Sequence, residues 1–355
     1  MVSPRSGVVG GISIWTNNIM QFVSGQPDIE LELCDFSRER SGQMIKNRLK
    51  RYILAIYDYM CLTINTIKQL RSFTGDVVHL STSASYLLIR DYLLLLFVKS
   101  DVKTCIHFHF GRIPILAQKE NWEWKLLKNI VRRSNVAIVM DRTSYDILRN
   151  EGFDNVELLP NPLSESVQDM IDKNILKREE RVLLFAGHCI RTKGVYELIE
   201  ACSQISNITL RMVGAVSDDM KAELMSLAGG NTGWLQILGQ ISHEETIRQM
   251  KLCDIFVLPT YTEGFPNVII ESMACGCPIV ATTVGAIPEM LEEHDGNYFG
   301  QLIEPRNSKQ IQMAIEKFLL NSKFKEDCGA NARKRVKERY GISSVGNMLK
   351  KIWER

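Results

Sequence analysis

FVLPTYTEGFPNVIIESMACGCPIVATTVGAIPEML, residues 256–291, is the stretch that decides the fold. An apolar run at 255–258 leads into a turn that contains Gly264. An amphipathic helix follows, passing through Glu271 to about Cys275, and a second short apolar run occupies 278–281. This succession of strand, turn, helix and strand is typical of a βαβ unit in a parallel sheet. Open sheets of this kind bind ligands at the carboxyl ends of their strands.

The same alternation of short β-branched runs and longer helical patterns extends over almost the whole chain. It predicts the α/β class, with two Rossmann-like parallel sheets that are covered by helices on both faces. The expected strands lie at 77–80, 104–108, 136–140 and 156–159 in the first half, and at 182–186, 208–213, 235–238, 255–258 and 278–281 in the second.

The domain organisation follows from length and from the segment Pro160-Asn161-Pro162. A chain of 355 residues exceeds the usual size of one hydrophobic core. We therefore expect two domains facing each other across a cleft, at 1–163 and 164–340. We further expect a helix at 341–355 that crosses back to the first domain. Few residues precede Gly10, so either the first strand is very short or the recorded start lies downstream of the true one.

Composition and charge exclude several classes of protein. The net charge of +2 gives no global positive field, so nucleic acid is not an expected partner. The nine cysteines lack zinc-site spacing, and no signal peptide precedes them, so we expect reduced thiols in a cytoplasmic protein. The most apolar run, 86–98, is interrupted by Arg90 and Asp91 and is too short to span a bilayer.

A basic amphipathic pattern at 46–71 leaves two interpretations open. Such a helix can lie on an anionic membrane surface, which would make the protein peripheral on the cytoplasmic face. It can equally be a helix that packs on the core and keeps its cationic ends in water.

Glu263 and Glu271 are the first candidate site residues. Glu263 lies in the turn after a predicted strand, and Glu271 lies in the helix that follows. The two carboxylates accept hydrogen bonds, as sugar hydroxyls require, and a helix N-terminus beside them suits a diphosphate. Spacing alone favours the plainer interpretation of a turn charge and a solvated helix residue.

Arg191 and Lys193 are the second pair of candidates. They follow Gly187 and the predicted strand at 182–186, so both cations lie past the carboxyl end of that strand. Together they can neutralise a departing diphosphate, although ordinary surface cations would look the same. No Asp-x-Asp occurs in the sequence, so neither a metal site nor a cofactor is expected.

Two features of the first half are weaker candidates. Gly10 and Gly11 precede a predicted helix and would let the backbone approach a ligand closely. His107 and His109 close the predicted strand at 104–108. We expect one imidazole to face a different way from the other, with His109 pointing into a cleft and His107 serving as a buried structural residue.

At these residues the chain resembles the family 4 retaining glycosyltransferases of the GT-B fold, the "glycosyl transferases group 1" type. The segment from Glu263 to Glu271 matches the Glu-x7-Glu element of that family, and Gly285-Ala-Ile-Pro-Glu289 continues the match. Further matches are Gly187, Arg191-Thr-Lys193-Gly194, Pro160-Asn161-Pro162, the segment at 76–79, and the strand that ends in His109.

The resemblance implies roles for individual residues. Glu263 would hold the transferred hexose, Glu271 would hold the nucleotide ribose, and His109 would lie near the reacting sugar. Arg191 and Lys193 would stabilise the donor diphosphate. The other implied donor-binding positions are Gly11, Gly187, Gly264, Phe265 and Asn267.

The resemblance also implies the reaction. A hexose is transferred from a nucleotide sugar, for which a UDP-sugar is favoured, to a glycan or lipid-linked acceptor. The anomeric configuration of the sugar is retained, and no metal is needed. Surface polysaccharide biosynthesis would be the context. Our mechanistic hypothesis is front-face substitution, in which the acceptor hydroxyl attacks C1 of the sugar from the side that the diphosphate leaves. A covalent double displacement through Glu263 is the open alternative. The alternatives are a nucleotide-sugar epimerase of the same fold and a non-catalytic nucleotide-sugar-binding protein. A nicotinamide dehydrogenase is disfavoured, because no Gly-x-Gly-x-x-Gly follows a strand.

Overall fold

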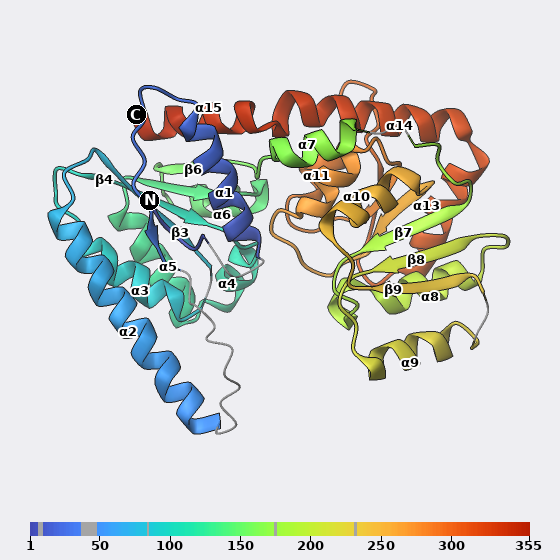
Figure 1. The fold of residues 1–355 in the computed structure, drawn as a ribbon, viewed down its shortest axis with the longest axis horizontal. Coiled ribbons are helices and arrows are strands. Elements are labelled where there is room, and N and C mark those ends of the chain that lie inside the picture. The colour runs from blue at the N-terminus through green and yellow to red at the C-terminus, as the bar shows by residue number, and fades with distance from the viewer. Residues whose placement is uncertain (6–9, 37–47, 84, 174–175, 231–232) are drawn as a thin grey trace. The chain divides into compact units, whose positions relative to one another are not determined.

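The computed structural model describes residues 1–5, 10–36, 48–83, 85–173, 176–230 and 233–355, and it describes side chains in 48–72 from Tyr57 onward. The chain divides into two compact units (Figure 1). Unit 1 comprises Met1–Pro162 and Val345–Arg355, and unit 2 comprises Leu163–Ser344. Unit 1 is therefore assembled from two separate segments of the sequence.

Unit 1 contains a parallel six-stranded sheet with the order β2-β1-β3-β4-β5-β6. The order reverses between β1 and β3, which makes that point the topological switch of the sheet. The described elements are β1 (Val2–Ser3), α1 (Gly11–Ser24), β2 (Cys34–Asp35), α2 (Arg48–Ser72), β3 (Val77–Thr82), α3 (Leu87–Leu95), β4 (Lys103–Phe108), α4 (Ile113–Lys119), α5 (Trp122–Arg133), β5 (Val136–Val139), α6 (Arg142–Asn150), β6 (Val156–Leu158) and α15 (Ile342–Glu354).

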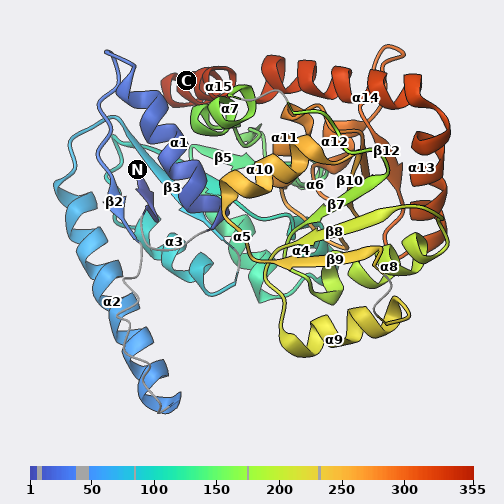
Figure 2. The same ribbon diagram turned by 45° about the vertical axis from the view of Figure 1, so that its right-hand side comes forward.

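The two faces of this sheet bury different kinds of side chain. On one face the alternate residues Leu80, Ile106 and Phe108 join a hydrophobic core with α3 and α5. On the other face His79 and His107 meet Trp15 of α1. Figures 1 and 2 show α1 on the opposite side of β3 from α3 and α5. The buried histidines of β3 and β4 therefore lie on one face of the sheet, and the apolar core lies on the other.

Unit 2 contains a second parallel sheet, with the order β12-β11-β10-β7-β8-β9. Its strands are β7 (Val182–Ala186), β8 (Thr209–Val213), β9 (Leu235–Gly239), β10 (Ile255–Leu258), β11 (Ile279–Thr282) and β12 (Gln301–Ile303). All residues of β7, β10 and β11 are buried, as expected for central strands with helices on both faces. The order reverses between β7 and β10.

The helices of unit 2 form two layers. In both views α10 and α11 lie on one side of the sheet and α8 and α9 on the other (Figures 1 and 2). The bounds are α7 (Glu165–Asp172), the 3-10 turn Arg191–Lys193, α8 (Val195–Ser203), α9 (Asp218–Leu227), α10 (His243–Leu252), α11 (Asn267–Ala274), α12 (Ile287–Leu291), α13 (Ser308–Leu320), α14 (Ser322–Arg335) and the π-helical turn Val336–Tyr340.

The prediction of an α/β protein with two Rossmann-like sheets is confirmed, and each predicted strand is present within a residue or two. Two short strands, β2 and β12, were not predicted, and β1, for which a very short first strand was one of the two alternatives, has two residues. The predicted basic helix at 46–71 corresponds to α2, but Lys46 and the side chains before Tyr57 lie outside the described residues. No helix in the described part of the chain is long and apolar enough to cross a membrane.

Candidate nucleotide-sugar site

The loops after β7 and β10 meet at the point where the strand order of unit 2 reverses. Backbone contact holds them together, because Tyr261 N–H donates to the carbonyl of Thr192 at 2.9 Å. Gly194 makes this approach possible. Its φ is +70°, and a Cβ there would lie 1.9 Å from the carbonyl oxygen of Pro259. The fold thus brings together two sequence segments that are about seventy residues apart, at the edge where such sheets bind ligands.

Lys193 and Glu263 form an ion pair between these two loops, from Lys193 Nζ to Glu263 Oε1. Both side chains are mostly buried, at 25% and 15% exposed. The ammonium group has three N–H donors, so one contact to Glu263 leaves donors for an anionic ligand. In this arrangement the carboxylate can accept a hydrogen bond from a sugar hydroxyl, and the ammonium group beside it can bind a phosphate.

The backbone of Glu263 and Gly264 rests directly on the turn that precedes α12. Ala286 N–H donates to the carbonyl of Gly264 at 2.9 Å. Gly285 has a φ of +56°, and a Cβ there would lie 2.4 Å from the carbonyl oxygen of Glu263. Only glycine fits this contact without a shift of the turn. The predicted motif at Gly285 therefore supports the loop that carries Glu263.

Glu271 lies in the second turn of α11, where its side chain is 12% exposed. Its Oε1 atom accepts a hydrogen bond from Nε2–H of His243 at 2.9 Å. This contact to Glu271 is the main cause that raises the pKa of His243 above its usual value, and partial burial opposes it. His243 begins α10, after β9, and was not among the predicted site residues.

Arg191 points in a different direction from Lys193. Its guanidinium lies over the ring of Tyr196, 4.9 Å from the centroid, and the residue is exposed. The structure thus brings Lys193 and Glu263 together but records no contact between Arg191 and either of them among the described residues. The diphosphate role of Arg191 stays a prediction.

The remaining predicted residues of unit 2 lie in the same two loops. Phe265 is buried, with its ring 5.7 Å from that of Tyr340, so its side chain serves packing. Asn267 begins α11, whose N-terminus has no side-chain cap. Gly187 follows β7, and its carbonyl oxygen would lie 1.9 Å from a Cβ at Gly214. Their predicted backbone contacts with a donor stay predictions.

Gly11 and His109 belong to unit 1. Gly11 is the first residue of α1, whose N-cap Gly10 has extended backbone and provides no side-chain cap. His109 N–H donates to the carbonyl of Thr82 at 2.9 Å, which places His109 at the carboxyl ends of β3 and β4. Both positions are therefore near the switch point of the first sheet, as a ligand contact would require.

The prediction that His107 and His109 face different ways is wrong. Their ring centroids are 3.8 Å apart, because residues two apart on a strand lie on the same face. Trp15 packs edge-on against both rings. Burial lowers the pKa of His109 to about 3 and also lowers that of His107. Both imidazoles are therefore neutral at physiological pH, and His107 is fully buried as expected.

The described residues contain no group of three or more His, Cys, Asp or Glu side chains placed to hold a metal ion.

Solved structures share this architecture. HepE (Alr3699) of Anabaena, solved in complex with UDP, superposes with a TM-score of 0.72 at 16% identity, covering 99% of this chain and 98% of that one. Such likeness shows the fold alone, which is the GT-B fold with two Rossmann-like domains.

Sequence comparison matches unit 2 to a family. Residues 166–335 match the model described as "Glycosyl transferases group 1". Unit 2 is thus a domain of that family, and the predicted resemblance to a group 1 glycosyltransferase is confirmed, whereas membership of family 4 stays a prediction.

Two curated relatives align with part of their length. CapM of Staphylococcus aureus, a capsular polysaccharide biosynthesis glycosyltransferase, is 26% identical over 253 residues, which are 69% of this chain and 62% of CapM. An N,N'-diacetylbacillosaminyl-diphospho-undecaprenol alpha-1,3-N-acetylgalactosaminyltransferase of Campylobacter jejuni is 24% identical over 252 residues, 70% of this chain and 62% of the relative. The matched region therefore spans less than two thirds of either relative.

Proposed function

We propose that this protein is a retaining, metal-independent glycosyltransferase that moves a hexose-type sugar from a UDP-sugar to a hydroxyl group of a glycan or lipid-linked acceptor. The observation that carries the proposal is the ion pair between Lys193 and Glu263 at the switch point of unit 2. It sets a hydrogen-bond acceptor for sugar hydroxyls beside a cation for the diphosphate, at the edge where sheets of this kind bind nucleotides.

The reaction that fits these groups is front-face substitution. The acceptor oxygen bonds to C1 of the sugar while the bond from C1 to the diphosphate oxygen breaks on the same face. The acceptor proton passes to an oxygen of the leaving diphosphate, so the charge balances without a base from the protein. Lys193 and Arg191 stabilise the negative charge that grows on the diphosphate, and this electrostatic effect is their catalytic contribution.

The nucleotide half of the donor is assigned to α11 and the loop before it. Glu271 would accept hydrogen bonds from the ribose hydroxyls, since one of its oxygens is not used by His243. The uncapped start of α11, at Asn267, presents backbone N–H groups toward the phosphates. A UDP complex of a protein with the same fold supports uracil as the base.

The acceptor is assigned to unit 1. In that unit, Gly11 is assigned to the donor diphosphate and His109 to the reacting sugar. Curated relatives act in capsular polysaccharide biosynthesis or on a diphospho-undecaprenol-linked sugar, which supports a lipid-linked or surface glycan as the acceptor. Cytoplasmic, peripheral contact with an anionic membrane belongs to the same proposal. This part of the proposal is supported by three exposed apolar side chains of α2, Tyr57, Met60 and Ile64. They are spaced three and four residues apart, so they lie on one face of the helix.

The test begins with a panel of nucleotide sugars, ranked by how much each raises the thermal unfolding temperature. The best donor is then incubated with acceptors that carry a lipid diphosphate-linked sugar, with and without EDTA. We expect a product whose anomeric configuration, measured by NMR, equals that of the donor, at a rate that EDTA does not change. Inversion, or dependence on a metal, would overturn those parts of the proposal.

Two other outcomes would replace the proposal altogether. A donor whose sugar changes configuration without any acceptor would identify an epimerase. A donor that binds tightly but is never turned over, across the whole acceptor panel, would identify a nucleotide-sugar-binding protein.

A further inference from the structure

We propose that His243 is a positioning residue that fixes Glu271 for recognition of the donor ribose. This inference deepens the proposed function and rests on it. The contact joins the Nε2 atom of His243, at the start of α10, to Oε1 of Glu271 on α11, at 2.9 Å. The two residues are 28 positions apart in the sequence, and only the packing of two neighbouring helices brings them together.

Glu271 needs such a partner because its side chain has three rotatable bonds and works at the end of a flexible stem. With Oε1 held by His243, the carboxylate plane is fixed and Oε2 is the oxygen that remains for a ribose hydroxyl. Holding a side chain in its bound geometry before the ligand arrives removes an ordering cost from binding. The expected effect is therefore on donor affinity rather than on the chemical step.

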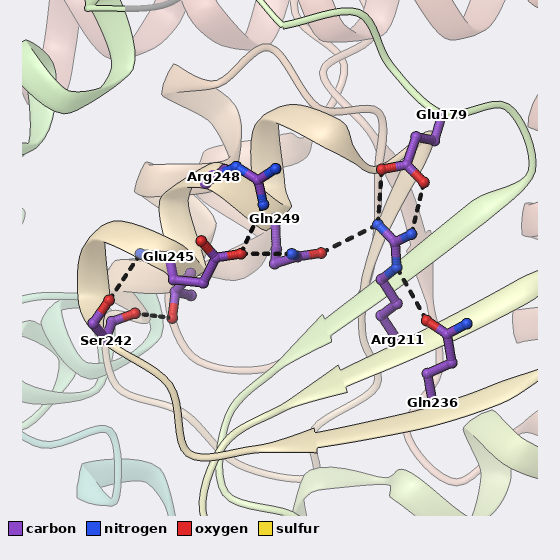
Figure 3. Close-up of polar contacts among 8 residues, drawn as sticks. Glu179, Arg211, Gln236, Ser242, Glu245, Arg248 and Gln249 are labelled. Atoms are coloured by element: carbon purple, nitrogen blue, oxygen red, sulfur yellow. Dashed lines mark hydrogen bonds and ion pairs between the residues drawn. The ribbon is translucent and has the colours of Figure 1, made fainter.

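The imidazole can fix Glu271 only if α10 is itself held in place, and the structure shows how it is held. Ser242 caps the helix, since its Oγ accepts from the N–H of Glu245 at 3.1 Å. Figure 3 shows a chain of polar contacts that continues from this cap across the helix to the sheet. Within it, the Glu245 side chain accepts from Arg248 at 3.0 Å and from Gln249 at 2.8 Å.

Arg211 on β8 connects this chain to the sheet. Its guanidinium donates to Gln249 at 3.2 Å and makes two bonds to the carboxylate of Glu179, at 3.0 and 2.6 Å. A further bond reaches Gln236 on β9 at 3.3 Å. A planar guanidinium with several partners fixes both position and orientation. Consequently α10, and with it His243, is tied to β8 and to its neighbour β9 in the sheet of unit 2.

The charges around His243 leave Glu271 as its specific partner. Among the charged residues that follow it on α10, Glu245 is engaged by Arg248 and Gln249. The shift in the pKa of His243 has Glu271 as its only charged cause. His243 is 48% exposed at the side chain, so it is accessible to solvent on one side while the contact occupies the other.

The test compares His243→Ala and His243→Gln by calorimetric titration with UDP and with 2′,3′-dideoxy-UDP. Glutamine can place an amide N–H near the position of Nε2, so it should restore the contact. We expect His243→Ala to weaken UDP binding about tenfold, a loss in the range of one hydrogen bond to a charged group. His243→Gln should bind UDP within about threefold of wild type. The wild type and the two variants should bind dideoxy-UDP with equal affinity.

His294→Ala is the matched control. His294 is an exposed histidine, and its ion-pair partner among the described residues is Asp295, at 3.5 Å. In turnover with a UDP-sugar, His243→Ala should raise KM about tenfold and leave kcat within about twofold. Unchanged UDP affinity in His243→Ala, or an equal loss for UDP and dideoxy-UDP, would overturn the inference.

The Glu271→Ala variant separates this inference from the proposed function. If Glu271→Ala weakens UDP binding and His243→Ala does not, only the role of His243 is overturned. If Glu271→Ala leaves UDP binding unchanged, or the wild type binds no UDP, the ribose assignment is overturned and the role of His243 with it.

Discussion

Gly285 has no side chain, which allows its backbone to lie against the turn that carries Glu263. We expect Gly285→Ala to lower the free energy of unfolding by about 2–4 kcal/mol, because φ is +56° and the new Cβ would press on the carbonyl of Glu263. UDP-sugar binding should weaken as Glu263 moves. Gly296→Ala is the control, since φ is +75° there but no described atom lies within 4 Å of a Cβ.

Urea unfolding followed by circular dichroism measures both variants. Gly296→Ala should cost only about 1 kcal/mol from backbone strain. If the two substitutions destabilise the protein equally, the contact with Glu263 is not what requires glycine at position 285.

Lys193 is the cation that the structure places beside Glu263. We expect Lys193→Ala to reduce kcat about 10²–10³-fold, the usual cost of removing one group that stabilises transition-state charge. Initial rates with saturating UDP-sugar check this. Lys309→Ala, which removes an exposed lysine of α13 that contacts Gln312, should leave the rate unchanged. A Lys193→Ala enzyme that keeps its full turnover would contradict the diphosphate role.

The pair of His243 and Glu271 should make stability depend on pH. Because Glu271 raises the pKa of His243, the stabilisation is complete below the unfolded pKa of about 6.5 and is lost as pH rises through the higher folded value. The difference in unfolding free energy between wild type and His243→Gln should therefore be largest below about pH 6.5 and should shrink as pH rises through the higher folded-state pKa of His243. It should stay below about 1 kcal/mol, since the imidazole is 48% exposed.

Urea titrations of both chains across this pH range provide the measurement. A difference that grows with pH would show that the charged form of His243 is not the stabilising one. Glu271 on α11 is the facing charge, and Glu244 and Glu245 follow on the same helix.

Single residues also show how far sequence reasoning reaches. Glu263 and Lys193 were each predicted from the strand, turn and helix around them, but their ion pair was not, because it depends on which strands are neighbours. His243 was missed for the same reason: it starts a helix as an unremarkable polar residue, and only the packing of α10 on α11 gives it a partner. His107 and His109 were assigned to different faces although strand geometry puts them on one.

At the scale of elements, α10 depends on Arg211 for its attachment to the sheet. We expect Arg211→Ala to lower the free energy of unfolding by about 1–3 kcal/mol, because it leaves Glu179 and Gln249 without their shared partner. Amide hydrogen exchange in His243–Leu252 should become faster. Arg248→Ala should cost about 0.5 kcal/mol or less, because Arg248 is 55% exposed in a local helix pair.

Hydrogen exchange followed by mass spectrometry resolves α10 from its neighbours. If Arg248→Ala and Arg211→Ala speed exchange in α10 to the same extent, the connection to β8 is not what holds the helix.

The predicted elements were those with strong patterns. Buried strands such as β7 and β10 are continuous apolar runs, which a parallel sheet covered on both faces requires. In contrast, β1 and β2 have two residues each, and β12 has three. So short a run has no periodicity of its own, and pairing with a neighbouring strand is what defines it as a strand.

At the scale of the whole molecule, Val345–Arg355 completes unit 1. Within that unit Val345, Leu349 and Ile352 are buried, and Trp353 Nε1–H donates to Nδ1 of His79 at 3.2 Å. We expect removal of residues 345–355 to destabilise unit 1 by several kcal/mol, about 1.5–3 kcal/mol for each buried aliphatic side chain.

Hydrogen exchange can assign the loss to one unit. Protection should fall in β3 and α1, whereas β7 and β10 should keep theirs. Lys351→Ala, at an exposed position of α15, should leave both units as they are. Retained protection in β3 after the deletion would show that unit 1 folds without α15.

The split composition of unit 1 also has a consequence for biosynthesis. During translation, Met1–Pro162 is synthesised first. The segment that completes this unit is Val345–Arg355, and it emerges only after all of Leu163–Ser344 has been translated. The apolar surface of nascent unit 1 that Val345–Arg355 covers in the complete protein therefore stays exposed until unit 2, a continuous segment of the chain, has been synthesised. In a cell this interval is when chaperones would be expected to bind the chain.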